Sequence, residues 1–313
     1  MPEEKFVSFI IPVLNGESAI GKCLEAIQNL DYPKGLFEII IADNGSKDNT
    51  LEIAKKYTSN IFVDTTATIA KLRNKGTKMA RGGFFAFVDS DCVIPRDWLR
   101  IAFAYFEKKD VAMVGAKTYN LPDGSSWWKK AWKIHLDRKI KLKEVMWLIS
   151  ESIIVRKDAF LSVGGFNESL RTCEDVDFGY NMRKKYKIIS DERLAPIHME
   201  KARTLSDFFR KEVWRSKGNI ANALNHLDEP KEIMGLVYVF YYLVLLAILL
   251  PSLIMTFVVR SPVYFFVVLL GLAIPLLIVS FDTCRRTAKY SYFFKLFIVY
   301  GVYVLAKVRA IFK

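Results

Sequence analysis

The stretch VSFIIPVLNGE, at residues 7–17, begins with a nearly continuous apolar run and ends in polar turn residues. A strand that is covered on both faces is apolar throughout, whereas a strand with one face in water alternates apolar and polar residues. We therefore expect a fully buried strand over Val7–Val13, with a polar loop at its carboxyl end.

The same sequence of buried strand, turn and helix recurs along the first hundred residues. Further strands are expected at 38–43, 61–64 and 84–91, and helices at 19–29, 48–57 and 69–81. Alternation with short connections predicts an α/β fold built on a mostly parallel sheet. Neither GxGxxG nor GxxxxGK(S/T) follows the first strand, so the sequence supports neither a Rossmann dinucleotide site nor a P-loop.

Three polar clusters follow expected strands, at residues 12–17, 43–46 and 89–91. Each cluster alone is ordinary turn or helix-cap chemistry. Ligands of parallel α/β sheets bind beyond the carboxyl ends of the strands, so three such clusters together favour a binding site.

Asp89 and Asp91 are the sharpest pair in these clusters. Residues two apart on an extended segment point the same way. Two carboxylates on one side suit Mg²⁺ or Mn²⁺, which bind through carboxylates together with substrate phosphates. Lys71 and Arg73, on the preceding helix, are expected within reach of the same phosphates.

Composition excludes several classes of protein. The chain has 313 residues, a net charge of +13 and a hydrophobic fraction of 52%, too apolar for a disordered chain. Its four cysteines lie far apart without a CxxC pair, which argues against a disulfide scaffold or a zinc site and fits a reducing compartment.

The apolar excess is concentrated near the C-terminus. Segments 233–259 and 261–281 carry no charge and are long enough to cross a membrane. Segment 290–306 contains Lys295, and it either spans the membrane or lies in the interface as an amphipathic helix. We therefore expect a first domain over 1–229 and a membrane region over 230–313.

Loop charges predict the orientation. Only Arg260 lies between the two uncharged segments, whereas four basic residues flank them on the outer sides: Lys231, Arg285, Arg286 and Lys289. The positive-inside rule then places residues 1–232 and the 282–289 loop in the cytoplasm of an integral protein of the cell membrane. The N-terminus lacks the pattern of a signal peptide. Because much of the basic charge flanks membrane segments, membrane lipid rather than nucleic acid is the expected partner.

A second basic stretch begins at Trp127 and continues to Lys143 with three interleaved tryptophans. Its aromatic and basic residues could stack on nucleic-acid bases, lie on a lipid surface, or form a solvated helix whose tryptophans are in the core. The proximity of membrane segments favours the lipid surface.

Four stretches carry a resemblance to a known family: VSFIIPVLNGE, EIIIADNGSKDNT, KLRNKGTKMARGGFFAFVDSDC and VGGFNESLRTCEDVDFG. In this order and spacing they resemble the nucleotide-sugar transferases of glycosyltransferase family 2. The resemblance covers roughly residues 7–218 and implies the GT-A nucleotide-sugar-binding fold, here followed by C-terminal transmembrane helices.

The resemblance implies a role for particular residues. Those expected to bind the nucleoside-diphosphate donor are Pro12, Val13, Asn15, Glu17, Asp43, Asn44, Arg73, Asp89 and Ser90. Asp89 and Asp91 form the DXD motif that holds the metal, and His198 is either a further metal ligand or a structural histidine. Glu174 and Asp175 correspond to the ED pair of the family, whose aspartate is the expected general base.

The chemistry supports a carboxylate base without the family. A glycosyl transfer must neutralise the leaving diphosphate and remove a proton from the acceptor hydroxyl. Glu174, Asp175 and Asp177 crowd one expected helix start, where a carboxylate is favoured in its anionic form. The alternative is a solvated acidic helix terminus. A base acting from the face opposite the diphosphate would invert the anomeric centre.

Two departures from the family pattern refine the expectation. A small residue followed by Asn is common before the strand that leads into Gly164 and Gly165, but here Glu151 brings a charge to that position. The Gln-x-x-Arg-Trp pattern of processive synthases is replaced by RKEVWR at 210–215.

We expect a metal-dependent, inverting transferase of the hexosyltransferase type. Its acceptor would be a lipid-linked or other saccharide at the cytoplasmic membrane face, in polysaccharide or glycolipid synthesis. The alternatives are a processive polysaccharide synthase and a non-catalytic membrane protein that binds nucleotide sugar, and the oligomeric state stays open.

Overall fold

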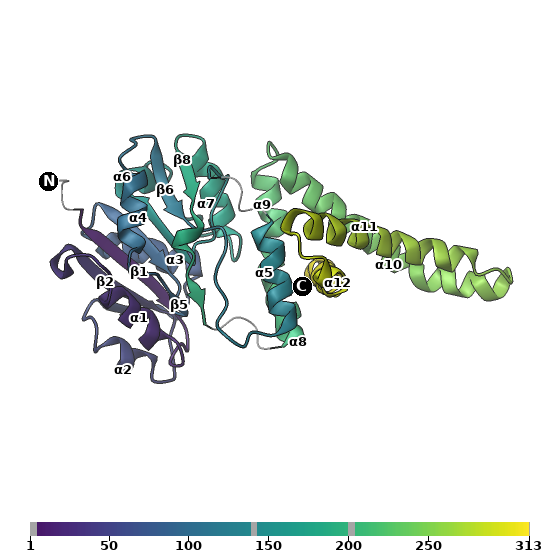
Figure 1. Cartoon of the computed structure of the whole chain (residues 1–313), viewed down its shortest axis with the longest axis horizontal. Coiled ribbons are helices and arrows are strands. Elements are labelled where there is room, and N and C mark those ends of the chain that lie inside the picture. The colour runs from purple at the N-terminus through teal and green to yellow at the C-terminus, as the bar shows by residue number, and fades with distance from the viewer. Residues whose placement is uncertain (1–4, 139–142, 200–203, 313) are drawn as a thin grey trace. The chain divides into compact units, whose positions relative to one another are not determined.

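The computed structural model describes residues 5–138, 143–199 and 204–312. The chain divides into two compact units (Figure 1). Unit 1 comprises Met1–Gly124 and Lys139–Lys201, and unit 2 comprises Ser125–Arg138 and Ala202–Lys313. The boundary expected at residue 229 from hydropathy alone falls inside unit 2, because short polar helices pack with the apolar ones.

Unit 1 is built on a seven-stranded sheet in the order β3-β2-β1-β4-β7-β6-β8. The strands are β1 (Val7–Val13), β2 (Phe37–Asp43), β3 (Ile61–Val63), β4 (Phe84–Val88), β6 (Val111–Gly115), β7 (Ser152–Arg156) and β8 (Lys187–Ser190). All neighbouring strands pair in parallel except β7, which is antiparallel to both β4 and β6. The mostly parallel α/β sheet expected from the sequence is confirmed.

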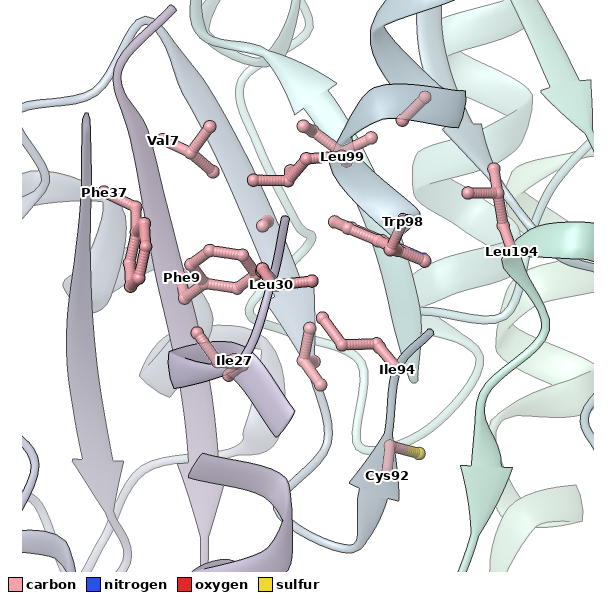
Figure 2. Close-up of a cluster of buried hydrophobic side chains, with 14 of the residues drawn as sticks. Val7, Phe9, Ile27, Leu30, Phe37, Cys92, Ile94, Trp98, Leu99 and Leu194 are labelled. Atoms are coloured by element: carbon pink, nitrogen blue, oxygen red, sulfur yellow. The ribbon is translucent and has the colours of Figure 1, made fainter. Parts of the chain in front are cut away.

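Strand β1 is buried along its whole length, as its apolar sequence predicts. Phe9 belongs to the core on one face of the sheet, and its neighbour Ile10 belongs to the core on the other face. Figure 2 shows the first of these cores, in which Phe9 lies 6.2 Å from Trp98 between ring centroids and Ile27 packs nearby. Burial on both faces explains why the strand is almost wholly apolar, and its one polar side chain, Ser8, donates to the Glu38 carboxylate at 2.7 Å.

Unit 1 has helices at the places expected from the sequence, 19–29, 48–57, 69–81 and the acidic stretch that begins with Glu174, and further helices that were not predicted. They are α1 (Ile20–Gln28), η1 (Lys34–Leu36), α2 (Thr50–Ala54), α3 (Ile69–Met79), α4 (Trp98–Tyr105), α6 (Lys157–Ser162), α7 (Glu174–Arg183) and η2 (Glu192–Leu194). Helix α2 is shorter than the expected 48–57, since the Asp48 side chain bonds to Thr50 at the helix start. The strand expected over 84–91 ends at Val88, because Asp89 turns the chain and its carbonyl accepts from the Cys92 amide at 3.0 Å.

A second, two-stranded sheet lies in unit 1. It pairs β5 (Cys92–Val93) with β9 (Ile197–His198) in antiparallel fashion, and Cys92 stands opposite His198. This pairing joins residues about a hundred positions apart, directly after the Asp89–Asp91 turn.

Unit 2 is helical. Its helices are α5 (Trp127–Asp137), α8 (Leu205–Arg215), η3 (Ser216–Gly218), α9 (Asn219–Asn225), α10 (Pro230–Val258), α11 (Val263–Thr287), η4 (Tyr290–Tyr292) and α12 (Phe293–Ala310). Three helical stretches, Pro230–Val258, Val263–Thr287 and Tyr290–Ala310, are long and apolar enough to cross a membrane. The prediction of a loop over 282–289 is mostly wrong, because residues 282–287 belong to α11, which continues to Thr287.

The basic aromatic stretch forms α5. The sequence left open whether its tryptophans stack on nucleic-acid bases, lie on a lipid surface or belong to a core. Trp128 is buried, and Trp132 packs at 5.0 Å from Phe208 and 5.1 Å from Tyr303 between ring centroids. These two side chains are part of the core of unit 2, whereas Trp127 is exposed. Residues 139–142 lie outside the described residues.

Candidate active site

Hydrogen bonds join the loop after β1 to the loop after β2. The Asn15 amide donates to Ser46 Oγ at 2.8 Å, and Asn15 Oδ1 accepts from the Lys47 amide at 2.9 Å. One Glu17 oxygen accepts two bonds from Asn49, each of 3.0 Å. Asn15 adopts a positive φ of 50°, so the loop turns sharply where it meets its neighbour. These contacts build one rim from two strand ends.

Polar side chains at the end of β2 hold the turn that follows it. The fully buried Asp43 carboxylate accepts bonds from the amides of Gly45 and Ser46, at 2.7 and 2.8 Å, which holds its own turn. Asn44 Nδ2 donates to the carbonyls of Asp64 and Ala67, at 2.6 and 3.1 Å. Pro12 and Val13 are the last residues of β1 and are buried. Of the residues expected to bind the donor, several therefore also hold the loops in place.

The third polar cluster meets the other two at Gly16. A Cβ added to Gly16 would lie 3.4 Å from Ser90 Oγ and 2.8 Å from Val13 Cγ2, so the β1 loop passes close to Ser90. The Gly16 amide also donates to Thr50 Oγ1 at 2.8 Å. The structure thus brings all three predicted clusters to one edge of the sheet.

Arg73 links two parts of the site through two ion pairs. Its side chain is only 1% exposed, and it bonds to Asp89 Oδ1 at 2.9 Å and to Glu174 Oε1 at 2.8 Å. Sequence reasoning expected this guanidinium to reach the donor phosphates, but in the structure it is committed to two carboxylates. It joins the end of β4 to the start of α7, which are far apart in the chain.

Oxygen and nitrogen ligands for a metal gather beside the Asp89 turn. One ligand atom each from Asp91, Cys92 and His198 lies within 4.8 Å of the other two, and His198 Nδ1 is 3.2 Å from Asp91 Oδ2. Burial and the nearby Glu151, Asp89 and Asp91 carboxylates raise the pKa of the Cys92 thiol well above its usual value, so the thiol stays protonated. Carboxylate and imidazole donors fit Mg²⁺ or Mn²⁺, and a protonated thiol does not.

Asp89 and Asp91 remain accessible to a ligand. Their side chains are 30% and 22% exposed, although Asp89 also bonds to Arg73. Asp91 and His198 therefore fit a divalent cation, whereas Asp89, the other aspartate expected to bind it, shares one oxygen with Arg73. His198 reaches this place because β9 pairs with β5.

The acidic start of α7 is not a solvated helix terminus. Glu174 and Asp177 are buried, and Asp177 Oδ2 accepts a bond of 3.2 Å from Asn181 Nδ2. Asp175 is partly exposed between them, and its carboxylate accepts bonds from the backbone amides of Val176 and Ser150. Burial and the adjacent Glu174 carboxylate raise the pKa of Asp175 to about 7, against the lowering effect of Arg73. A carboxylate with this pKa can accept and release a proton near neutral pH.

The segment leading into α7 is held in an unusual conformation. Cys173, directly before the helix, has a φ of 67°, and Gly165 has a φ of 74°. Asn74 clamps Phe166 with two bonds, donating from Nδ2 to the Phe166 carbonyl at 2.8 Å and accepting the Phe166 amide at 3.0 Å. A Cβ at Gly165 would lie 2.9 Å from Asn74 Oδ1, so glycine lets the two segments approach.

One residue of this site, Asn74, was not predicted from the sequence. Asn74 looked like one polar residue of a basic helix, and nothing in its spacing indicated the clamp on Phe166. Cys92 directly follows the second aspartate of the DXD motif, but its protonated thiol does not suit the cation.

Fold and site together define a GT-A type α/β transferase for nucleotide sugars. Residues 8–167 match the family described as Glycosyl transferase family 2, and the chain belongs to this family. The chain is 28% identical over 232 residues to glycosyltransferase AglE of Haloferax volcanii, which covers 69% of the chain and 73% of AglE.

Two further comparisons place the fold. The solved mannosyltransferase PcManGT from Pyrobaculum calidifontis, in complex with GDP-Man and Mn²⁺, has a TM-score of 0.65 and 16% identity, with 100% of this chain and 87% of that chain covered. The structure of S. aureus TarS has a TM-score of 0.51 and 24% identity, with 69% of this chain and 40% of that chain covered. In sequence, TarS, a poly(ribitol-phosphate) beta-N-acetylglucosaminyltransferase, is 36% identical over 121 residues, which span 36% of this chain and 21% of TarS.

Proposed function

We propose that this protein transfers a sugar from a nucleoside-diphosphate sugar to an acceptor hydroxyl, with inversion at the anomeric carbon and dependence on Mg²⁺ or Mn²⁺. The observation that carries the proposal is the buried Arg73, which ties Asp89 to Glu174 at 2.9 and 2.8 Å. This one side chain holds the cation-binding turn beside the helix start that bears Asp175.

The donor half of the site lies along the clipped strand ends. Asn15, Glu17 and Asn44 line the rim that would hold the nucleoside. Asp89, Asp91 and His198 would hold the cation, which when bound neutralises charge on the leaving diphosphate. PcManGT was solved with GDP-Man and Mn²⁺, and a TarS structure with UDP-GlcNAc, which supports a nucleotide-sugar donor without choosing its base or sugar.

The acceptor half of the site centres on Asp175. As general base, this carboxylate would take the proton from the acceptor hydroxyl while the oxygen attacks the anomeric carbon and the bond to the diphosphate breaks. Glu174 is the wrong candidate for this step, because its oxygen is bonded to Arg73 and its side chain is 9% exposed. Attack from the side opposite the leaving group inverts the anomeric centre.

The three apolar helices support a role at a membrane. Loop charges favour a cytoplasmic unit 1, and a lipid-linked or other saccharide at that face is the acceptor we propose. A processive synthase remains a weaker candidate, because RKEVWR stands at 210–215 where such enzymes carry Gln-x-x-Arg-Trp. The Asp175 carboxylate, held by the Val176 amide at 2.9 Å and with a raised pKa, favours an enzyme over a non-catalytic sugar-binding protein.

A thermal-shift screen of nucleoside diphosphates tests the proposal. The full chain in detergent is melted with UDP, GDP, ADP and CDP, each with and without Mn²⁺. We expect one or two of them to raise the melting temperature only when Mn²⁺ is present. If none does so, or if the same shift appears with a chelator, the proposed donor site is wrong.

A further inference from the structure

Glu151 is a buried carboxylate next to the proposed cation site. It directly precedes β7, whose pairing with β4 sets Ser152 opposite Val88. The Asp89 amide donates to the Glu151 carbonyl at 3.0 Å, so the backbone of Glu151 is fixed against the Asp89 turn. The Glu151 side chain is only 6% exposed.

The His198 ring lies between two carboxylates. Its Nε2 is 3.5 Å from Glu151 Oε2, and its Nδ1 is 3.2 Å from Asp91 Oδ2. The ring is in T-shaped contact with Tyr119, with ring centroids 6.0 Å apart, and the backbone amide of His198 donates to the Asn120 carbonyl at 3.2 Å. Each ring nitrogen therefore faces one acid, and the ring has a defined place from which to do so.

We propose that Glu151 is a positioning residue of the cation site, acting through His198. The inference rests on the proposed metal dependence. A neutral imidazole carries one N–H and one lone pair. With the N–H at Nε2 facing Glu151, the lone pair is at Nδ1, on the side of Asp91 where the cation would bind. Carboxylates that receive the second N–H of a metal-binding histidine fix its tautomer and make it a stronger ligand.

The position of Glu151 favours this role over a purely structural one. An N–H at His198 Nε2, 3.5 Å from Glu151 Oε2, would offset part of the cost of burying this carboxylate. Asp91, rather than Glu151, borders the accessible side of the ring, since its side chain is 22% exposed against 6% for Glu151. A cation arriving from solvent would therefore meet Asp91 and Nδ1 first.

A double-mutant cycle on Mn²⁺ binding tests the proposal. Binding of Mn²⁺ alone is measured by the loss of the free-ion EPR signal, on the full chain in detergent, for wild type, Glu151→Gln, His198→Ala and the double variant. We expect Glu151→Gln to weaken Mn²⁺ binding by about 10–100-fold, the usual cost of losing such a partner. In the His198→Ala background the same substitution should change the affinity by less than about twofold.

Glu38→Gln is the matched control, because Glu38 is also a buried carboxylate of the sheet but bonds to Ser8 and Arg81. It should leave Mn²⁺ affinity unchanged. Should Glu151→Gln melt early, Glu151→Asp takes its place, since the shorter side chain keeps the charge but draws it away from Nε2; it should also weaken binding.

Three results would overturn the inference. Unchanged Mn²⁺ affinity in Glu151→Gln, or in Glu151→Asp where that variant replaces it, would refute any role for the Glu151 carboxylate. An equal loss with and without His198 would show that Glu151 does not act through the histidine. Absence of Mn²⁺ binding by the wild type would reject the proposed metal dependence together with this inference. The first two results would reject the inference alone, because the wild type still binds Mn²⁺ in them.

Discussion

Replacement of Arg73 by methionine tests how the two halves of the site are held together. The substitution keeps an unbranched apolar stem but removes the guanidinium that Asp89 and Glu174 share at 2.9 and 2.8 Å. Removing one partner of a buried ion pair costs about 3–5 kcal/mol, because the remaining charge is left uncompensated. In a unit of this size each kcal/mol lowers the melting temperature by about 2–4 °C, so we expect a drop of roughly 6–20 °C.

Arg81→Met is the matched control for this measurement. Arg81 also pairs with a buried carboxylate, Glu38, at 3.0 Å, but its own side chain is 73% exposed. Exposed pairs contribute about 0–1 kcal/mol, so the melting temperature should fall by no more than about 4 °C. Both variants and the wild type are melted at one scan rate in the same detergent, followed by tryptophan fluorescence. If the mean melting temperature of Arg73→Met lies within 2 °C of that of Arg81→Met, the Arg73 ion pairs do not hold the two halves of the site together.

Three further predictions concern the cation, the topology and the base. Asp91→Ala should weaken Mn²⁺-dependent nucleotide binding by at least about 10-fold while the melting temperature without ligand stays the same, and unchanged affinity by calorimetry would contradict the assignment. A cysteine placed at Ser261 should react with a membrane-impermeant maleimide in intact cells, whereas one placed at Thr287 should not, with the unsubstituted chain as background; the reverse pattern would reject the orientation. Because the pKa of Asp175 is raised to about 7 and the base must be deprotonated, kcat/KM should rise with pH from 6 to 8, and a flat or falling profile would refute this role.

Much of the fold could be predicted because a strand that is buried on both faces is a continuous apolar run in the sequence. Val7–Val13 was predicted with the bounds that β1 has, since every residue of it is buried on a covered sheet. The antiparallel β7 was not predicted, because pairing direction depends on where the chain returns to the sheet and not on composition. Helix α11 continues beyond the uncharged segment 261–281 to Thr287, because helix propensity and capping, rather than charge, set where a helix ends.

The site was predictable at the strand ends and less so elsewhere. The clusters after β1, β2 and β4 had to meet, because parallel strands share their carboxyl edge. The roles of Arg73 and His198 depend on tertiary contacts between residues about a hundred positions apart, which no spacing encodes. A basic residue near a diphosphate site suggests phosphate contact, but burial gave Arg73 two carboxylates as partners instead.

The most direct test of the account is turnover by Asp175→Asn at saturating donor, compared with Asp177→Asn. Asparagine keeps the shape of Asp175 and removes its basicity, while Asp177 is buried and bonds to Asn181 within α7. We predict that Asp175→Asn lowers kcat by about 10²–10⁴-fold with nearly unchanged donor affinity, and that Asp177→Asn costs much less. Near wild-type kcat in Asp175→Asn, or an inactive Asp177→Asn alongside an active Asp175→Asn, would contradict the account.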